Sequence, residues 1–246
     1  MSDTTENILT HIRVVLVETS HPGNIGAAAR AMKTMGFSQL VLVNPRCEID
    51  AVARARASGA VDVLDAAQVC ADLSEALADC TLSVACTSRR RDLPHPSHTP
   101  RSAAPELLAQ AQLAPVALVF GSETFGLTNE QLSLCRWIVS IPGNPHYLSL
   151  NLAQAVQVMV YELRASLLDQ PVAQPAFPLA SHAAIEGVER ELLGVLGEIG
   201  FYDPAYSKKL LPRLRRFFAR AGLEKQEAAI WHGMLANIRR ALTRDN

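Results

Sequence analysis

The chain has 246 residues, of which 49% are hydrophobic and 19% are charged, and its formal net charge at pH 7 is −1. This composition is typical of a globular protein with one sizeable core and a small second unit, and it excludes extensive disorder. No apolar run reaches the ~18 residues of a transmembrane helix, and the first residues lack a basic, apolar signal segment, so we expect a cytoplasmic protein without a membrane partner.

Short apolar runs alternate with helical patterns through the first two thirds of the chain. We expect strands at 12–17, 40–43, 82–86, 116–120 and 137–141. We expect helices at 24–35, 54–58, 73–78, 103–112, 128–135 and 150–168, whereas 61–64 is compatible with a further short strand and 92–102 is a proline-rich loop. Continuous apolar runs are typical of strands buried on both faces of a parallel sheet. The pattern predicts an α/β fold, with a mainly parallel sheet and helices on both faces.

A second unit follows a stretch without periodicity. Residues 169–178 contain three prolines, and we interpret them as a linker between a main domain at 1–168 and a small all-helical domain at 179–246. Helices are expected at 185–199, from a Ser207 cap to Ala221, and at 225–242. The side chains predicted to face the core of this domain are Leu210, Leu214, Phe217, Phe218, Trp231, Leu235, Ile238 and Leu242. Those predicted to stay in solvent are Lys208, Lys209, Arg213, Arg215, Arg216 and Arg220.

Charge is distributed unevenly between these two parts. Residues 207–246 contain ten Lys and Arg against three Asp and Glu, a balance of +7, which leaves 13 against 21, or −8, for residues 1–206. A basic tail on an acidic body favours an RNA-binding appendage. A basic helix pair that is merely solvated would give the same count, so the charge alone leaves both interpretations open.

The five cysteines, at positions 47, 70, 80, 86 and 135, form no C-x-x-C pair. An odd number without that spacing argues against a zinc site and against a disulfide framework, and we expect reduced thiols, most of them in the core. His95 and His98 flank a Pro-Ser pair, but no helix aligns them, so we predict no metal.

Three junctions between a strand and a helix are rich in glycine and asparagine. Their sequences are GNIGAAAR at 23–30, FGSETFGLTNE at 120–130 and IPGNPHYLSLNLAQAV at 141–156. In the third, a Gly-Pro turn ends a strand, and Ser149 and Asn151 stand where the next helix would begin. Free backbone N–H groups at such junctions suit a polar ligand, so the three turns predict one composite site. Taken singly, each turn is equally typical of an ordinary capped loop.

The three motifs, N-x-G-x-x-x-R, G-x-E-x-x-G-L and I-P-x-N-P-x-x-x-S-L-N, occur in the order in which the SPOUT superfamily of RNA methyltransferases has them. The chain resembles the 2'-O-ribose-methylating branch of that superfamily over residues 12–165. Within the branch, the opening VLVETSHPGNIGAAARAMKTMG is similar to bacterial enzymes that methylate the ribose 2'-hydroxyl of nucleotide 32, a cytidine or uridine, in the tRNA anticodon loop. The resemblance implies a C-terminal trefoil knot, S-adenosyl-L-methionine as cofactor, tRNA as substrate, and a homodimer in which an arginine of one subunit completes the site of the other.

The resemblance also implies which residues bind the cofactor. They are Thr87, Ser88, Arg89, Gly121, Ile141, Gly143, Leu148, Ser149 and Leu150. The two glycines suit this role because a residue without a Cβ lets the backbone approach a ligand closely, although either glycine alone is equally typical of a turn. Arg89 belongs to a basic trio, 89–91, which is also compatible with a solvated loop. Ser122 stands where relatives often carry arginine, so a phosphate contact there is absent or is made by the trio.

Arg30 matches the essential arginine of this branch, so the resemblance places it near the ribose 2'-hydroxyl. A guanidinium group hardly ever loses its proton. We therefore expect Arg30 to hold a phosphate and polarise the hydroxyl, with a phosphate oxygen or water taking the proton. The residues expected to support it are Asn24, Glu123, Ser149 and Asn151, although Glu123 is equally typical of a loop staple.

Two other classes of function are less well supported. The sequence GNIGAAA at 23–29 superficially resembles a dinucleotide-binding turn, but it lacks the G-x-G start, and the second strand ends at Asn44-Pro45 rather than at a ribose-binding acid. A non-catalytic RNA-binding module with the same fold is compatible with the motifs, as is methylation of a different tRNA or rRNA position. The presence of Arg30, Asn144 and Ser149 favours an enzyme.

Overall fold

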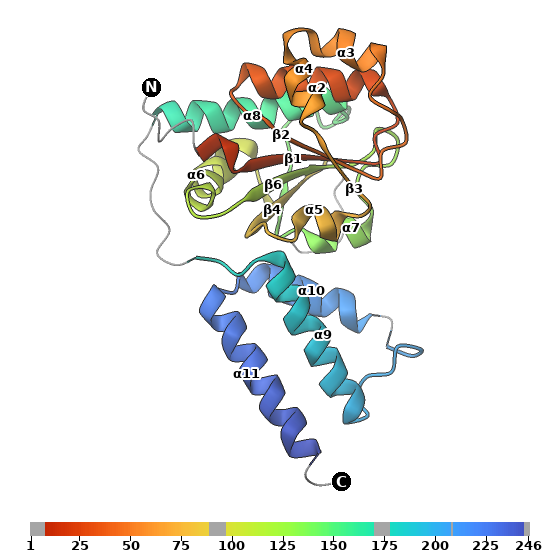
Figure 1. Cartoon of the computed structure of the whole chain (residues 1–246), viewed down its shortest axis with the longest axis vertical. Helices are drawn as coiled ribbons and strands as arrows, with labels where there is room; N and C mark the ends of the chain where they lie inside the picture. Colours follow the sequence, from red (N-terminus) through yellow and green to blue (C-terminus); the bar gives the residue numbers. More distant parts are fainter. Residues whose placement is uncertain (1–7, 89–96, 170–177, 208, 244–246) are drawn as a thin grey trace.

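The computed structural model describes residues 8–88, 97–169, 178–207 and 209–243, and Figure 1 shows a unit built on a β-sheet above a unit of three helices. Most of the predicted linker at 169–178 lies outside the described residues, as do His95, Lys208 and the Arg89–Arg91 trio. Among the described residues, no helix has both the length and the apolar character required to cross a bilayer.

The strands of the upper unit are β1 (Ile12–Val17), β2 (Gln39–Val43), β3 (Gln68–Cys70), β4 (Leu82–Cys86), β5 (Ser97–His98), β6 (Val116–Phe120) and β7 (Trp137–Val139). Its helices are α2 (Pro22–Thr34), α3 (Ala51–Ala57), the 3-10 helix η1 (Ser58–Ala60), α4 (Val61–Asp65), α5 (Leu73–Leu77), α6 (Pro100–Ala111), α7 (Asn129–Leu134) and α8 (Leu152–Asp169). The lower unit consists of α9 (His182–Glu198), α10 (Leu210–Ala221) and α11 (Lys225–Leu242).

All strand pairs of the sheet are parallel, and the strand order is β3-β2-β1-β6-β4-β7-β5. Successive side chains of a strand point to opposite faces. On β1, Val14 and Leu16 pack with buried residues of α2, α6 and α8, whereas Val15 and Val17 pack with those of α5 and α7. The predicted class, a parallel α/β sheet covered on both faces, is confirmed.

The strand order brings distant turns together. β1, β6, β4 and β7 are consecutive neighbours in the sheet, although other elements separate them in the sequence. Because the strands are parallel, their carboxyl ends share one edge of the sheet. Ligand sites of open α/β sheets lie outside that edge. The three junctions singled out in the sequence follow β1, β6 and β7, so the fold gathers them there.

Residues 61–64 are helical, and the short strand considered for them is wrong. They belong to α4, whose Val63 and Leu64 are buried in the same core cluster as α2. A run of four apolar residues fits one buried helical turn as well as a strand, because so short a run has no distinguishable period. The strand of this region is instead β3, at the sheet edge, where Val69 is 65% exposed and gives no buried apolar run.

The start of α6 differs from the predicted one. This helix begins at Pro100 and not at Ala103, because Thr99 caps it: the Thr99 hydroxyl accepts a hydrogen bond from the Ser102 N–H at 3.2 Å. Ahead of the cap, Ser97 and His98 add the short edge strand β5 to β7. The part of the predicted 92–102 loop that the structure describes is therefore ordered secondary structure.

The three-helix unit has a small core of its own. Val188, Val195, Phe218 and Leu235 are buried in it, and the rings of Phe218 and Trp231 meet edge to face with centroids 5.7 Å apart. The basic helix and the helix after it are therefore real elements of a folded unit.

Two core positions and one helix cap of this unit were predicted wrongly. Phe217 is 47% exposed and Ile238 is 45% exposed, so neither packs inward. Three helices share a core too small to cover every apolar position of each stripe. Ser207 does not cap α10 with its side chain, because the helix begins at Leu210 and the Ser207 carbonyl accepts the Leu210 N–H at 3.0 Å.

The two units are docked onto each other through the start of α9. The His182 N–H donates to the Cys80 carbonyl at 3.0 Å, and the Ala183 N–H donates to the Ala78 carbonyl at 3.1 Å. The His182 side chain is buried, with Nε2 at 2.8 Å from the Ser83 hydroxyl of β4. Burial and, to a lesser extent, the nearby Arg136 lower the pKa of His182 to about 4. The contact is therefore made by a neutral imidazole at neutral pH.

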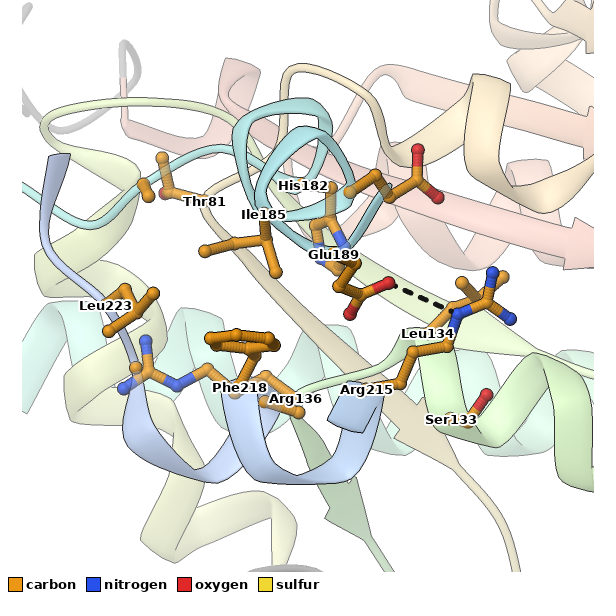
Figure 2. A pocket seen from close by; sticks show the side chains of 14 residues that line it. Thr81, Ser133, Leu134, Arg136, His182, Ile185, Glu189, Arg215, Phe218 and Leu223 are labelled. Carbon is orange, nitrogen blue, oxygen red and sulfur yellow. Dashed lines mark hydrogen bonds and ion pairs between the residues drawn. The ribbon is translucent and has the colours of Figure 1, made fainter. Parts of the chain in front are cut away.

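A pocket of about 520 Å³, partly open to solvent, lies at this seam (Figure 2). Figure 2 shows Glu189 of α9 pointing toward Arg215 of α10, and the two are 3.4 Å apart. Arg215 is thus partly buried and paired, which corrects the expectation that it stays in solvent. Burial raises the pKa of Glu189 to about 7, and Glu186 adds to this effect while Arg215 opposes it.

Candidate active site at the sheet edge

The first turn at the sheet edge links β1 to α2. Pro22 occupies the first turn of α2, and His21 caps the helix, because its Nδ1 accepts the Gly23 N–H at 3.1 Å. Gly26 lies further along, against α3, where a Cβ would overlap the Ala53 carbonyl. Gly26 therefore serves close helix packing rather than a phosphate-binding turn, which removes the main support for a dinucleotide site.

The second turn follows β6 and folds back on itself. The Gly126 N–H donates to the Ser122 carbonyl at 2.9 Å, and Gly126 adopts a positive φ of 67°. A Cβ on Gly121 would overlap the backbone of Gly126 and Leu127. Gly121 is thus required by this turn itself, which supports the turn role, one of the two roles left open for this glycine. The Ser122 hydroxyl accepts the Phe125 N–H at 3.3 Å, so it too is used inside the turn.

The third turn, between β7 and α8, contains a tight loop at 144–147. The Tyr147 N–H donates to the Asn144 carbonyl at 2.8 Å, and the His146 N–H donates to the Asn144 side chain at 3.0 Å. Asn151 stands directly before α8, and its side-chain oxygen accepts the Ala153 N–H at 3.0 Å. The predicted cap at this position is therefore made by Asn151.

Glu123 ties the three turns together. Its carboxylate accepts hydrogen bonds from Asn24 Nδ2 at 2.9 Å and from both the N–H and the hydroxyl of Ser20 at 3.1 Å. The His21 N–H donates to the same carboxylate at 3.3 Å. Asn151 Nδ2 in turn donates to Asn24 Oδ1 at 2.9 Å. One side chain from each turn, Asn24, Glu123 and Asn151, thus forms a continuous chain of hydrogen bonds.

The Glu123 carboxylate remains ionised in this network. Burial, the largest single influence, would raise its pKa, but the hydrogen bonds from Asn24, the Glu123 backbone and Ser20 together lower the pKa below its ordinary value. An ionised carboxylate that only accepts hydrogen bonds is suited to holding loops and unsuited to acting as a general acid. Two roles were open for Glu123, support of the catalytic arginine and bonding of loop backbone. The geometry supports the second, in which the carboxylate holds neighbouring loops together.

The network borders a pocket whose empty volume is about 790 Å³, part of it continuous with solvent. Apolar and polar groups from the ends of β4, β6 and β7 line it. The predicted cofactor residues that line it are Thr87, Ser88, Gly121, Ile141, Leu148, Ser149 and Leu150. The Thr87 N–H donates to the Val139 carbonyl at 3.0 Å, which fixes the turn after β4 against β7.

The remaining predicted residues lie elsewhere. Gly143 is exposed and outside the pocket lining, and a Cβ there would make only ordinary contact with Leu148 at 3.7 Å, so close approach does not require a glycine. Arg30 is exposed on α2, outside the lining, and the described residues offer its side chain no hydrogen bond or ion pair. Arg89 lies outside the described residues.

Comparison with known proteins decides the family. Residues 11–161 match the SpoU rRNA Methylase family, and residues 183–246 match the C-terminal domain of the tRNA methyltransferase TrmJ. The tRNA (cytidine/uridine-2'-O-)-methyltransferase TrmJ of Klebsiella pneumoniae is 48% identical over 237 residues, which cover 94% of this chain and 97% of that protein. The chain belongs to the TrmJ family.

Solved structures agree with this assignment. The crystal structure of TrmJ from Z. mobilis ZM4 superposes with a TM-score of 0.83 at 33% identity and covers 92% of this chain and 98% of that chain. A more distant likeness is the AdoMet-bound rRNA methyltransferase from Sinorhizobium meliloti, with a TM-score of 0.50 at 25% identity over 64% of this chain and 57% of that one. Both parts of the chain therefore have counterparts in the TrmJ family, and the sheet unit has counterparts beyond it.

Sequence reasoning missed several residues of this TrmJ-family pocket. Cys86, Phe120 and Val139 line it, and each is the last residue of its strand. Their position at carboxyl ends of parallel strands was a usable signal. Ser20 was missed because its role, two hydrogen bonds to Glu123, depends on a residue a hundred positions away and leaves no local pattern.

Packing and burial describe the surroundings of His98, Cys80 and Cys135 in this TrmJ-family chain. His98 stacks on Trp137 with ring centroids 4.3 Å apart. Burial raises the pKa of Cys80 and of Cys135 to about 12, which keeps both thiols protonated at neutral pH. Within 8–88, 97–169, 178–207 and 209–243, no group of three or more His, Cys, Asp or Glu side chains is placed to hold a metal ion.

Proposed function

We propose that this protein transfers a methyl group from S-adenosyl-L-methionine to the ribose 2'-hydroxyl of a cytidine or uridine at nucleotide 32 of tRNA. The observation that carries the proposal is the convergence of the turns after β4, β6 and β7 on one pocket, in a chain of the TrmJ family. The turn after β1 does not line this pocket but is hydrogen-bonded to Glu123 at its border. Nucleotide 32 rests on the opening motif at 15–36, and its position in an anticodon loop makes the ribose accessible.

The pocket fits this cofactor. Ligand sites of this size combine apolar walls with a few polar groups that set orientation. Ile141, Leu148 and Leu150 offer apolar contact to an adenine ring, and the Ser149 hydroxyl offers hydrogen bonds to polar atoms. When bound, the cofactor supplies an electrophilic methyl on a positive sulfonium, so the protein needs to position the hydroxyl rather than to activate the methyl.

Residues around the pocket have two different roles in this proposal. Glu123, Asn24 and Asn151 link the turns at the sheet edge, so they would hold the pocket in shape and position the ribose hydroxyl when the cofactor is bound. Arg30 lies outside the pocket of its own chain, and no described residue pairs with its guanidinium group, which fits its delivery to the pocket of a second subunit. There it would grip a tRNA phosphate bidentately and polarise the 2'-hydroxyl, and a phosphate oxygen or water would take the proton.

The experiment is methyl transfer from radiolabelled S-adenosyl-L-methionine to unmodified tRNA, followed by mapping of the modified nucleotide. We expect a 2'-O-methylated cytidine or uridine at nucleotide 32, and an Arg30→Ala variant with transfer reduced by about 100-fold or more but unchanged cofactor affinity. Mixing Arg30→Ala with a variant disabled in the pocket should restore part of the activity if Arg30 acts across subunits. Transfer to a base or to another nucleotide would overturn the proposed reaction, and binding of tRNA without any transfer would favour a non-catalytic module.

A further inference from the structure

The outer face of α10 combines unpaired arginines with an exposed aromatic ring. This helix contains four arginines and no acidic residue. Arg215 pairs with Glu189, whereas the ion pairs among the described residues include none to Arg213, Arg216 or Arg220. Phe217 follows Arg213 by four residues and precedes Arg220 by three, and this spacing places the three side chains on one face of a helix.

The fold orients the ring of Phe217. Its centroid lies 5.3 Å from that of Phe218 in an edge-on contact, and Phe218 is buried in the core against Trp231. Nearly half of the Phe217 side chain nevertheless remains exposed. A ring that is already oriented loses little conformational freedom when a flat partner stacks on it.

A second exposed ring precedes the same helix. Tyr206 is 88% exposed and belongs to the connection between α9 and α10. Hydrogen bonds hold this connection: the Tyr206 N–H donates to the Asp203 carbonyl at 3.1 Å, and the Asp203 carboxylate accepts the Ala205 N–H at 2.8 Å. The Asp203 charge is thus engaged with backbone rather than with α10.

We propose that Tyr206, Arg213, Arg216, Phe217 and Arg220 form a surface, the α10 face, that binds unpaired nucleotides of the tRNA. The two rings stack on bases that are splayed out, and the guanidinium groups contact the flanking phosphates. This inference rests on the proposed function and adds the residues through which the helical unit recognises RNA. In Figure 1 the α9–α10 connection lies on the same side of the view as the turn between β1 and α2.

Charge favours RNA over a second copy of the chain as the occupant. In a symmetric contact, the same surface patch meets itself. The α10 face would then bring Arg213, Arg216 and Arg220 against their own copies, and like charges at such distances repel. RNA instead offers phosphates that pair with the arginines and flat bases that stack on the two aromatic rings.

The first test separates stacking from general apolar contact. We expect Phe217→Leu and Tyr206→Leu each to raise the Kd for unmodified tRNA about 5- to 100-fold, whereas Phe217→Tyr and Tyr206→Phe, which keep a ring, stay within about twofold. Ile230→Leu, at an apolar position of α11 that is 60% exposed, is the matched control and should change nothing. In methyl-transfer assays the Leu variants should raise KM for tRNA and leave kcat unchanged. Circular dichroism reports whether Phe217→Leu still folds, and Tyr206→Leu tests the surface without touching the core.

The second test isolates the arginines by their salt dependence. Each phosphate contact that is lost lowers the slope of log Kd against log salt by about 0.7 to 1. We expect this decrease for Arg213→Gln and for Arg220→Gln, and an unchanged slope for the two Leu variants. Arg54→Gln is the control, because Arg54 lies on α3 and pairs with Asp65 at 2.7 Å.

A third measurement reads stacking directly. Tryptophan fluorescence is quenched when a base stacks on the indole, so Tyr206→Trp should be quenched by tRNA, beyond the change in the parent protein, and not by a fully paired RNA duplex. Unchanged tRNA affinity in both Leu variants, or equal quenching by the duplex, overturns the proposal. The proposal also fails if the Leu variants keep their tRNA affinity but change the molecular mass of the protein on sedimentation, because the α10 face would then contact a second copy of the chain. If tRNA binds with these dependences but no methyl is transferred, the α10 face stands and the proposed reaction fails.

Discussion

The pocket at the sheet edge and the pocket at the seam differ in what lines them more than in size. The edge pocket, about 790 Å³, is built from turns after parallel strands, and Glu123 is the single charged residue among the described residues that line it. The seam pocket, about 520 Å³, is lined by Arg136, Arg215, Glu186 and Glu189, together with the buried His182. A search for clustered, perturbed ionisable groups would select the seam. The sheet topology instead indicates the edge pocket as the ligand site, because that pocket lies at the carboxyl ends of the parallel strands.

The difference agrees with the chemistry proposed for the edge pocket. Methyl transfer to a hydroxyl depends on orientation, so its site needs fixed backbone turns and few titratable groups. At the seam, docking of α9 and α10 onto the sheet unit buries Glu189 and His182, and burial is the largest cause of the pKa shift of each. Perturbed groups thus mark a structural joint here. The comparison predicts that changes at the edge abolish function, whereas changes at the seam alter stability.

The largest effect is expected from Glu123→Ala, which removes the acceptor shared by Asn24, Ser20 and His21. Each hydrogen bond to a charged group contributes about 1.5–3 kcal/mol, so the turns lose their common anchor, and we expect kcat/KM for methyl transfer to fall by about 100-fold or more. Glu130→Ala, at an exposed carboxylate in the first turn of α7, is the matched control. Retained transfer with the Glu123 variant would show that the pocket does not depend on the linked turns.

A smaller effect at the edge distinguishes its two glycines. In Gly121→Ala the new Cβ overlaps backbone, so the turn after β6 must shift, whereas in Gly143→Ala the Cβ finds ordinary contact. We expect cofactor affinity to fall about tenfold for Gly121→Ala and to stay within about twofold for Gly143→Ala, as measured by calorimetric titration. Equal losses in the two variants would mean that Gly143 approaches the cofactor in a way that the pocket lining does not indicate.

The sequence predicted the edge far better than the seam. Buried strands leave apolar runs and the turns after them are glycine-rich, so the parallel sheet and the composite site were both readable, and the resemblance supplied Thr87 and Ser149. Strand order was not readable, because no local pattern says that β6 lies beside β1. The seam could not be predicted because Ser83, Arg136 and His182 lie far apart in the sequence, and none of them belongs to a local motif. Phe217 was misplaced because helical periodicity shows an apolar stripe without showing how much of it a small unit covers.

The smallest effect is expected at the seam, where two pH dependences oppose each other. The folded protein holds the Glu189 proton more tightly than the unfolded chain does, with a pKa of about 7 against 4.5. Its contribution to stability is complete below pH 4.5 and is lost as the pH rises through 7. For His182 the folded pKa of about 4 lies below the ordinary 6.5, so its contribution is complete above pH 6.5 and is lost as the pH falls through 4.

Between pH 4.5 and 6.5 the Glu189 and His182 contributions to the free energy of unfolding therefore change with pH in opposite directions and cancel in the wild type. A variant that removes one of the two groups should reveal the pH dependence of the other. Glu189→Gln leaves the His182 slope, so its free energy of unfolding should fall on acidification. His182→Gln keeps a partner for Ser83 and leaves the Glu189 slope, so its free energy of unfolding should fall as the pH rises. Each slope is at most about 1.4 kcal/mol per pH unit and is reduced by solvent screening. Urea unfolding across this range measures both, and parallel curves for the two variants would show that the seam charges do not titrate independently.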